Sequence, residues 1–173
     1  MECNRIAIRN FRNIEYADVS FDPGVNILVG ANAQGKTNLL EAIGFAAIGK
    51  SFRTVHEEEM IRFGQETAEI SMDYTDSVRR QNITVRMMAG KRKHIEQNKV
   101  KVGRVSDIVG AFRTVLFCPE DLMVLKAGSS ARRRLGDHAL CQLRPNYEAA
   151  LTEYHRILEQ KSRILKDRYE DPR

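Results

Sequence analysis

Eight residues, GANAQGKT at 30–37, combine two glycines, a lysine and a threonine at the spacing G-x-x-x-x-G-K-[ST]. In this motif the backbone N–H groups of a loop surround phosphate oxygens, and the glycines allow close approach. Lys36 is expected to reach the terminal phosphates, and the Thr37 hydroxyl is expected to ligate Mg²⁺. The predicted nucleotide-binding residues are Gly30, Ala31, Asn32, Ala33, Gln34, Gly35, Lys36, Thr37 and Asn38.

The segments on either side of this loop must position it. VNILV at 25–29 is a short apolar run without a polar face, which predicts a strand buried on both sides. From Leu39 the apolar residues fall at 39, 40, 43, 46 and 47, the spacing of one helix face, and Gly49 indicates the helix end. The positive end of this helix would point at the bound anion. Strand, glycine loop and helix together predict an α/β P-loop nucleotide-binding fold.

Hydrolysis would require more than this loop. P-loop NTPases also use an acidic residue after a second strand to hold Mg²⁺, and a group that orients the attacking water. Glu120 and Asp121, which follow the apolar, strand-like run RTVLF at 113–117, are the candidates, although Pro119 separates them from it. The sequence therefore predicts a chain that binds ATP but lacks a complete catalytic site.

Period-two alternation predicts further strands that lie around the helix. The segments with this pattern are RIAIRNF (5–11), YADVSF (16–21), AEISMDYTD (68–76) and a meander at 81–102. The meander is expected to turn near 89–90 and again near 97–98. The expected inward positions of the first two strands are Ile6, Ile8, Val19 and Phe21.

The last 45 residues are helical in character. Pro145 is expected to separate two helices, the second carrying an apolar seam at alternating three- and four-residue spacing from Tyr147 to Ile164. Such a seam needs a second helix, and no partner sequence remains, which suggests a truncated chain. We therefore expect an ATP-binding lobe at 1–128 and the start of a helical lobe at 129–173.

Composition fits a globular protein of one domain with an appendage. The chain has 173 residues, of which 42% are hydrophobic and 29% charged. No apolar stretch is long enough for a membrane span and no signal peptide is visible, so a cytoplasmic location is expected. Three widely spaced cysteines, without a CxxC pair, argue against a zinc site or disulfide framework.

Basic residues gather in two places, and the net charge is +5. Such clusters can contact the DNA backbone, because phosphate contacts require only flexible positive charge. A solvated hairpin and a solvated helix face are the plain alternatives, and ion pairs with Glu120 or Asp121 are a further one for the second cluster. The candidate DNA contacts are Lys91, Arg92 and Lys93 in the first cluster and Arg132, Arg133 and Arg134 in the second.

Several blocks together resemble one family. The blocks NFRN (10–13), GANAQGKTNLLEAI (30–43), GKSFRT (49–54), LFCPEDLMVLKAG (116–128) and RRRLGDHALCQL (132–143) occur in this order. They are similar to the bacterial RecF family of DNA replication, recombination and repair proteins, over essentially the whole chain. The glycine loop alone would indicate only a P-loop protein, whereas the KSFRT and PEDL…RRR blocks are specific.

The resemblance implies an ABC-type ATPase head like those of SMC-like repair proteins, with a mixed β-sheet around a central helix and a second, helical lobe. Such heads form homodimers on ATP, with the signature motif of one subunit facing the loop of the other. The family binds DNA at gaps, interacts with RecR, helps load the recombinase and belongs to the SOS response. Its signature motif and metal-binding acid lie in a C-terminal half, which would make this chain an N-terminal fragment.

The resemblance also assigns residues outside the loop. PEDL falls where such heads place a nucleotide-sensing loop, so Glu120 and Asp121 become candidates for sensing near the metal instead of for hydrolysis. Arg12, Asn13 and Arg53 fall where related heads contact the nucleotide, although each could be an ordinary surface or packing residue. Gly136, where the family has a bulky apolar residue, is a departure near the lobe junction.

Two functions remain in competition at this point. The first is an ATP-binding head of the RecF type, in which DNA binding depends on ATP. The second is a module that binds DNA or RecR without nucleotide. A small P-loop kinase would need a substrate lid and an acceptor site, and neither is visible.

Overall fold

The computed structural model describes residues 1–118, 128–144 and 146–170, and the backbone alone at residue 131 and at 167–170. The chain divides into two compact units, Met1–Cys118 and Pro119–Arg173, which we describe one at a time. The boundary expected at residue 128 stays a prediction, because residues 119–127 lie outside the described part.

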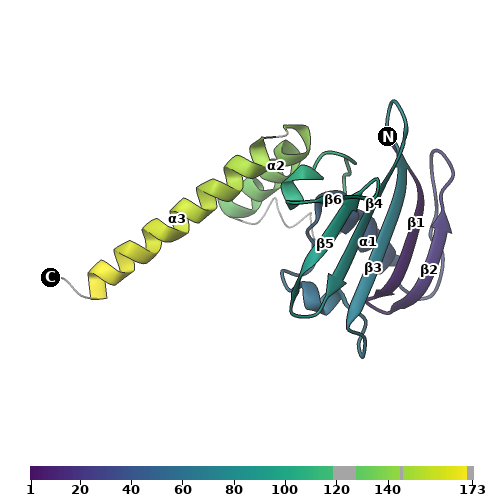
Figure 1. The fold of residues 1–173 in the computed structure, drawn as a ribbon, viewed down its shortest axis with the longest axis horizontal. Coiled ribbons are helices and arrows are strands. Elements are labelled where there is room, and N and C mark those ends of the chain that lie inside the picture. The colour runs from purple at the N-terminus through teal and green to yellow at the C-terminus, as the bar shows by residue number, and fades with distance from the viewer. Residues whose placement is uncertain (119–127, 145, 171–173) are drawn as a thin grey trace. The chain divides into compact units, whose positions relative to one another are not determined.

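The first unit is built on one six-stranded sheet in the order β2-β1-β3-β4-β5-β6 (Figure 1). All the pairings within it are antiparallel. The strands are β1 Glu2–Phe11, β2 Ile14–Ser20, β3 Thr67–Thr75, β4 Arg80–Met88, β5 Lys91–Gln97 and β6 Val100–Val102. Both expected meander turns are confirmed, because β4 ends at Met88 and β5 at Gln97.

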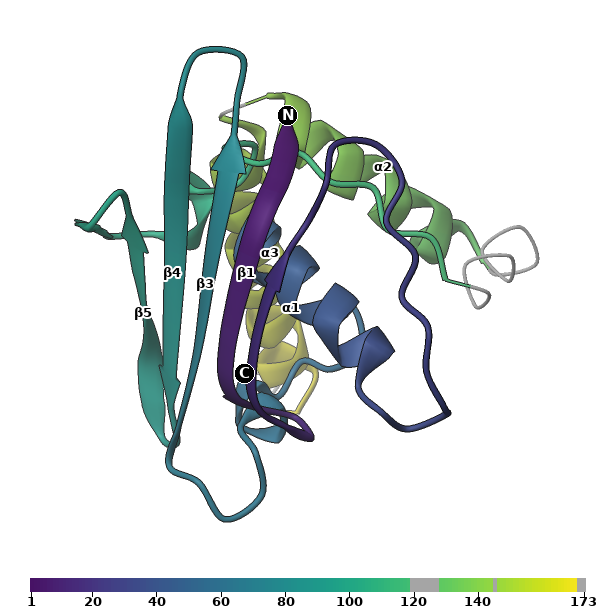
Figure 2. The ribbon, with the colours of Figure 1, turned by 90° about the vertical axis from the view of Figure 1, so that its right-hand side faces the viewer.

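One face of this sheet forms the core. Along β3 burial alternates strictly, with the side chains of Ala68, Ile70, Met72 and Tyr74 inside. Ile6 and Ile8 of β1 are fully buried on the same side, as their alternation predicts, whereas Val19 and Phe21 are only partly buried. Helix α1, Lys36–Ile48, lies along this face (Figure 2) and packs on β1, β3 and β4.

Helix α1 is buried more evenly around its axis than its apolar spacing predicts. Leu39 and Phe45 lie in the core with four small residues of the helix. Leu40, expected on the inner face, is 43% exposed instead, and that part of the prediction is wrong. Because alanines and glycines fill much of the helix, the sheet approaches it closely and the buried surface extends beyond one stripe. A carboxylate, Glu41, lies inside this surface with 0% exposure.

Two expected strands are absent from the described structure. Residues 25–29 form no strand and belong to no sheet, and Val25, Ile27 and Val29 are 80–88% exposed. Leu28, between them, packs against the core, so only one face of this apolar segment is covered. The run 113–117 likewise forms no strand, and Val115 is bare. A strand requires a neighbouring strand, and neither run belongs to the sheet in the part of the chain that the structure describes.

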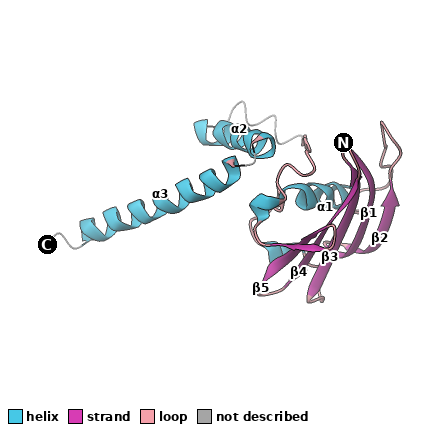
Figure 3. Cartoon of the chain, turned by 45° about the horizontal axis from the view of Figure 1, so that its top comes forward, coloured by secondary structure: helices cyan, strands magenta, loops and turns pink. Residues whose placement is uncertain are grey.

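The described part of the second unit contains two helices, α2 Ser129–Leu143 and α3 Tyr147–Glu170 (Figure 3), which confirms the break expected around Pro145. They are joined by hydrogen bonds from the Tyr147 hydroxyl to Asp137 and from the Cys141 thiol to buried Glu148. The predicted seam of α3 is exposed, including Tyr154, Ile157 and Ile164. None of the described helices is long and apolar enough to cross a bilayer.

Replacing Gly49 by alanine is expected to destabilise the first unit by about 1–2 kcal/mol. Gly49 ends α1 in the left-handed region with φ 66°, and an added Cβ would lie 2.5 Å from Cγ1 of Val105. Gly136→Ala is the matched control: that glycine lies within α2 with open space around it, so alanine should stabilise its helix by about 1 kcal/mol. Thermal unfolding followed by circular dichroism measures both, and equal signs would contradict the argument.

Candidate nucleotide-binding site

The glycine loop leads directly into the first turn of α1. Gly35 precedes the helix with φ 99°, a conformation that favours glycine. A Cβ at this position would lie 3.1 Å from Oδ1 of Asn13 and 3.3 Å from Cγ1 of Ile14. Both the dihedral angle and the close packing therefore explain why the motif has a glycine here.

The β1–β2 turn holds this loop from outside. Nδ2 of Asn13 donates to the carbonyl oxygen of Ala33 at 2.7 Å, and Oδ1 of Asn13 accepts from Nδ2 of Asn38 at 2.7 Å. Ala33 adopts a positive φ of 63°, which is unusual for a residue with a Cβ. The Asn13 hydrogen bond fixes this strained peptide, so the shape of the loop depends on a residue far away in the sequence.

Lys36 closes over the loop. Its Nζ donates to the carbonyl oxygens of Gly30 at 2.7 Å and Ala31 at 2.6 Å. The Thr37 side chain is exposed in the first helical turn, and that turn has no side-chain cap and no acidic residue. Uncapped N–H groups at a helix start bind anions, so the lysine and the helix can together hold a polyphosphate.

A buried carboxylate joins two predicted site residues below the loop. Glu41 Oε1 accepts from Nη2 of Arg12 at 2.7 Å, and Oε2 accepts from Nε of the same guanidinium at 3.1 Å. Nη1 of Arg53 donates to Oε2 at 3.0 Å, and the Ser51 hydroxyl donates to Oε1 at 2.6 Å. Arg12 and Arg53 are predicted to contact the nucleotide, and this stays a prediction; the structure adds the buried carboxylate that lies between them.

These contacts keep the carboxylate of Glu41 charged. Burial alone would raise its pKa, but hydrogen bonds from Arg12 and Ser51, with the charges of Arg12 and Arg53, lower the pKa below the ordinary value of 4.5. Two guanidinium groups around one carboxylate leave a net positive charge. That charge favours an anionic ligand at this cluster, although the carboxylates of Glu58 and Glu59 also line the cleft beside it.

A wide cleft of about 1030 Å³ is lined by Asn13 and Asn38, the two side chains that bond to each other next to the loop. Two of the residues that line the cleft are hydrogen-bonded to each other: Oδ1 of Asn38 accepts from Nη1 of Arg53 at 2.7 Å. The cleft is lined by Arg12, Asn13, Asn38 and Arg53, by the acidic residues Glu58 and Glu59, by the segment 61–65 and by Ala89. The structure therefore brings the candidates Arg12, Asn13 and Arg53 to one cleft, which they share with the predicted loop residue Asn38.

The structure describes only some of the residues that are predicted to bind the metal ion. Glu120 and Asp121 lie outside the described residues. Among the described residues there is no cluster of three histidine, cysteine or carboxylate side chains that could hold a metal ion. Mg²⁺ commonly uses one or two protein ligands with phosphate oxygens and water, so the exposed Thr37 hydroxyl fits the role expected of it.

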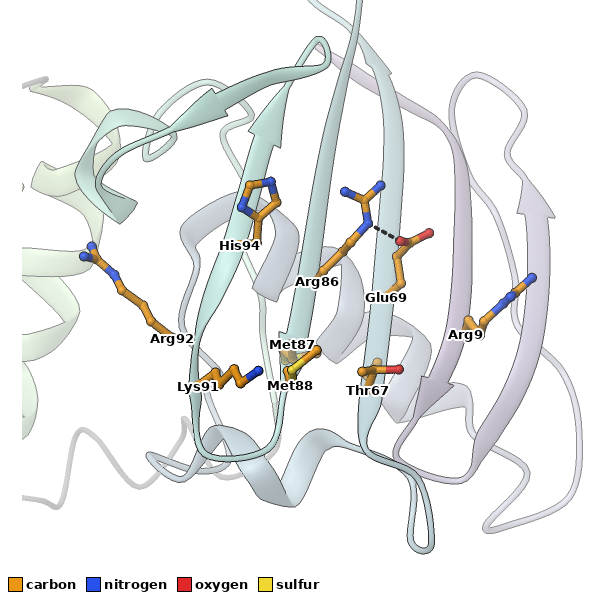
Figure 4. Close-up of a pocket in the computed structure, with 10 residues that line it drawn as sticks. Arg9, Thr67, Glu69, Arg86, Met87, Met88, Lys91, Arg92 and His94 are labelled. Atoms are coloured by element: carbon orange, nitrogen blue, oxygen red, sulfur yellow. Dashed lines mark hydrogen bonds and ion pairs between the residues drawn. The ribbon is translucent and has the colours of Figure 1, made fainter.

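The three residues of the first basic cluster differ in exposure. Lys93 is 11% exposed, pairs with Glu57 and lies over the Phe45 ring, so its charge is already engaged. Lys91 and Arg92 are exposed and border a pocket of about 470 Å³ on the outer sheet face, where Arg86 pairs with Glu69 (Figure 4). Lys91 and Arg92 therefore remain candidates for contact with a polyanion.

The second basic cluster is on α2. Arg132, Arg133 and Arg134 occupy consecutive positions near the start of that helix and are exposed. Consecutive residues on a helix point about 100° apart, so the three side chains spread around α2 instead of lining one face.

Sequence patterns did not identify Glu41 and Ser51 as part of the site. Glu41 stands in an apolar helical run one turn after Lys36, a position where burial of an acid is costly without partners. An acidic residue inside an apolar helix was the signal in the sequence that could have indicated Glu41. Its partners come from the β1–β2 turn and from the segment after α1. No local pattern relates such distant residues.

Comparisons with known proteins agree with this geometry. A family model for the AAA domain matches residues 5–115. A protein called DNA replication and repair protein RecF from Acetivibrio thermocellus is 35% identical over 167 residues, 96% of this chain and 45% of the relative. The protein of that name from Agathobacter rectalis is 40% identical over 162 residues, 94% of this chain and 45% of the relative. The chain thus spans about half the length of the curated relatives it matches.

Solved structures give the same result for the fold. The structure described as the recombination mediator protein RecF-ATPrS has a TM-score of 0.93 at 32% identity, covering 99% of this chain and 47% of that one. An SMC head domain from Thermotoga maritima has a TM-score of 0.55 at 19% identity, covering 65% of this chain and 43% of that one, and supports the fold alone. The chain belongs to the AAA domain family, with the P-loop ATPase head fold, and its resemblance to bacterial RecF proteins is confirmed across nearly its whole length.

Proposed function

We propose that this chain binds ATP with Mg²⁺ as the loop-bearing part of a RecF-type DNA repair ATPase head. The observation that carries the proposal is the loop geometry: Lys36 lies over the carbonyls of Gly30 and Ala31, at the uncapped start of α1. The relative whose structure is described as RecF-ATP, at 33% identity, supports ATP as the ligand. In this proposal the β- and γ-phosphates lie in the loop, Thr37 ligates Mg²⁺, and the rest of the nucleotide extends toward the Arg12–Arg53 cleft.

We further propose that the complete protein dimerises on ATP in the cytoplasm, binds DNA at gaps and acts with RecR. A dimer would supply the second half of each nucleotide site. The exposed apolar run 25–29 supports a need for further strands, because Val25, Ile27 and Val29 have no cover in the described structure. In this scheme the rest of the protein provides the metal-binding acid, and Glu120 and Asp121 sense the nucleotide.

The chain is expected to bind Mg-ATP and to hydrolyse it negligibly. Calorimetric titration should give saturable, one-to-one binding that weakens when Mg²⁺ is removed with a chelator. A phosphate-release assay at the same protein concentration should show no turnover above buffer. Robust hydrolysis by this chain, lost in the Lys36→Ala variant, would contradict the incomplete site and return Glu120 and Asp121 to the role of catalytic acids.

The alternative is a module that binds DNA without nucleotide, favoured by the exposed Lys91, Arg92 and the arginines at 132–134. Titrating labelled gapped DNA with and without ATP separates the two. A head that switches on ATP should bind DNA only when ATP is present. DNA affinity that is independent of ATP and falls steeply with salt concentration would instead support the module.

A further inference from the structure

We infer that Glu41 is a positioning residue of the nucleotide site: its buried carboxylate, neutralised by Arg12, holds Arg53 with free donors toward the cleft beside the phosphate loop. The inference deepens the proposed function and rests on it, since it assigns the means by which this chain orients a charge toward the nucleotide.

The carboxylate is fully used as an acceptor. Its side chain is 0% exposed, and each oxygen receives two hydrogen bonds: Oε1 from Arg12 and Ser51, and Oε2 from Arg12 and Arg53. A buried carboxylate is tolerated only with such partners. Glu41 thus fixes where both guanidinium groups lie.

The two arginines have different remaining capacity. Arg12 is 16% exposed and donates to both Glu41 oxygens and, through Nη1, to the carbonyl oxygen of Glu59 at 2.8 Å. Arg12 lies in the β1–β2 turn with a positive φ of 54°, and its backbone N–H donates to the carbonyl oxygen of Met60. Arg12 therefore supports the carboxylate more than it faces a ligand.

Arg53 is the group left to meet the nucleotide. It is 43% exposed, and its Nη1 is shared between Glu41 at 3.0 Å and Asn38 at 2.7 Å. Within the part of the chain that the structure describes, Nε and Nη2 of Arg53 have no hydrogen-bond partner. Asn38 lies two residues after Lys36, so these donors are presented next to the first turn of α1.

The turn that carries Arg53 is also built on Glu41. The Ser51 hydroxyl donates to the carboxylate and accepts from the backbone N–H groups of Arg53 at 3.0 Å and Thr54 at 3.2 Å. Removing the carboxylate charge would release both the guanidinium and the turn. Glu41 acts through Arg53 and does not itself touch the ligand.

The test is a double-mutant cycle on ATP binding with the 173-residue chain. Glu41→Gln and Arg53→Gln should each weaken ATP binding about tenfold, the scale of one charge-assisted hydrogen bond. The double variant should bind no more weakly than Arg53→Gln alone, because the two residues act as one unit. A merely structural role of Glu41 would instead give additive losses, and additive losses would overturn the inference.

Two further variants keep the test decisive. Glu69→Gln makes the same chemical change to an arginine-paired glutamate on the outer sheet face and should bind ATP like the unaltered chain. Glu41→Asp keeps the charge but shortens the side chain, so it should weaken binding even where Glu41→Gln does not fold. Full affinity in a folded Glu41→Asp or Glu41→Gln variant overturns the inference alone. Absence of ATP binding by the unaltered chain overturns the proposed function and this inference together.

Discussion

Lys36→Ala is expected to lower the affinity for ATP by about 100-fold or more, because charge-assisted hydrogen bonds to the phosphates are lost. The reason is the position of its ammonium group. Nζ of Lys36 is the cation held over the loop, bonded to the carbonyl oxygens of Gly30 and Ala31. When phosphate enters, the ammonium group can exchange these carbonyls for phosphate oxygens with little movement. Calorimetry with Mg-ATP measures the effect.

The control for this prediction is Lys101→Ala, the same change at an exposed lysine of β6. It should leave ATP affinity unchanged. Both variants should keep the far-ultraviolet circular dichroism spectrum of the unaltered chain, because neither lysine lies in the core. Equal affinities for the two variants would remove the loop from the binding site.

Phe45→Ala is expected to destabilise the first unit by about 3–5 kcal/mol, the usual cost of removing a buried aromatic ring. Phe45 is fully buried in α1, and its ring also lies 5.3 Å from Nζ of Lys93. Loss of the ring therefore creates a cavity between helix and sheet and removes the cation–π partner of a mostly buried lysine. Chemical denaturation with urea measures the free energy of unfolding.

Phe63→Ala provides the comparison, because Phe63 is fully exposed and the substitution is chemically identical. Its effect should stay within about 0.5 kcal/mol. A loss for Phe45→Ala no larger than this would mean that α1 is not packed on the sheet as described. Since α1 carries the phosphate loop at its start, the Phe45 variant should also bind ATP only while it remains folded.

The sequence predicts what depends on local spacing and fails where distant residues decide. The loop at 30–37, the strands of the meander and the two C-terminal helices all follow from short patterns, and the structure contains them. Apolar character predicts that Leu40 and the run 25–29 are buried, yet Leu40, Val25, Ile27 and Val29 are exposed. An apolar side chain is buried only where other residues pack over it, and those residues come from other parts of the sequence.

The site shows the same division. The loop residues are predicted from their spacing alone, since the motif lies within one short segment. Glu41 could not be identified in this way, because its role depends on Arg12 from the β1–β2 turn and on Arg53 from the segment after α1. Those three residues meet only after the sheet has formed and the helix has packed on it.

The exposure of three apolar side chains, Val25, Ile27 and Val29, has a further consequence for the behaviour of the chain in solution. An extended apolar ribbon without a neighbouring strand is a template for pairing with a second copy and so promotes aggregation. Here the ribbon runs directly into Gly30, so a strand added along it would end beside the phosphate loop. Self-association would then compete with nucleotide for the same end of the molecule, and dilution would favour the ligand-competent monomer.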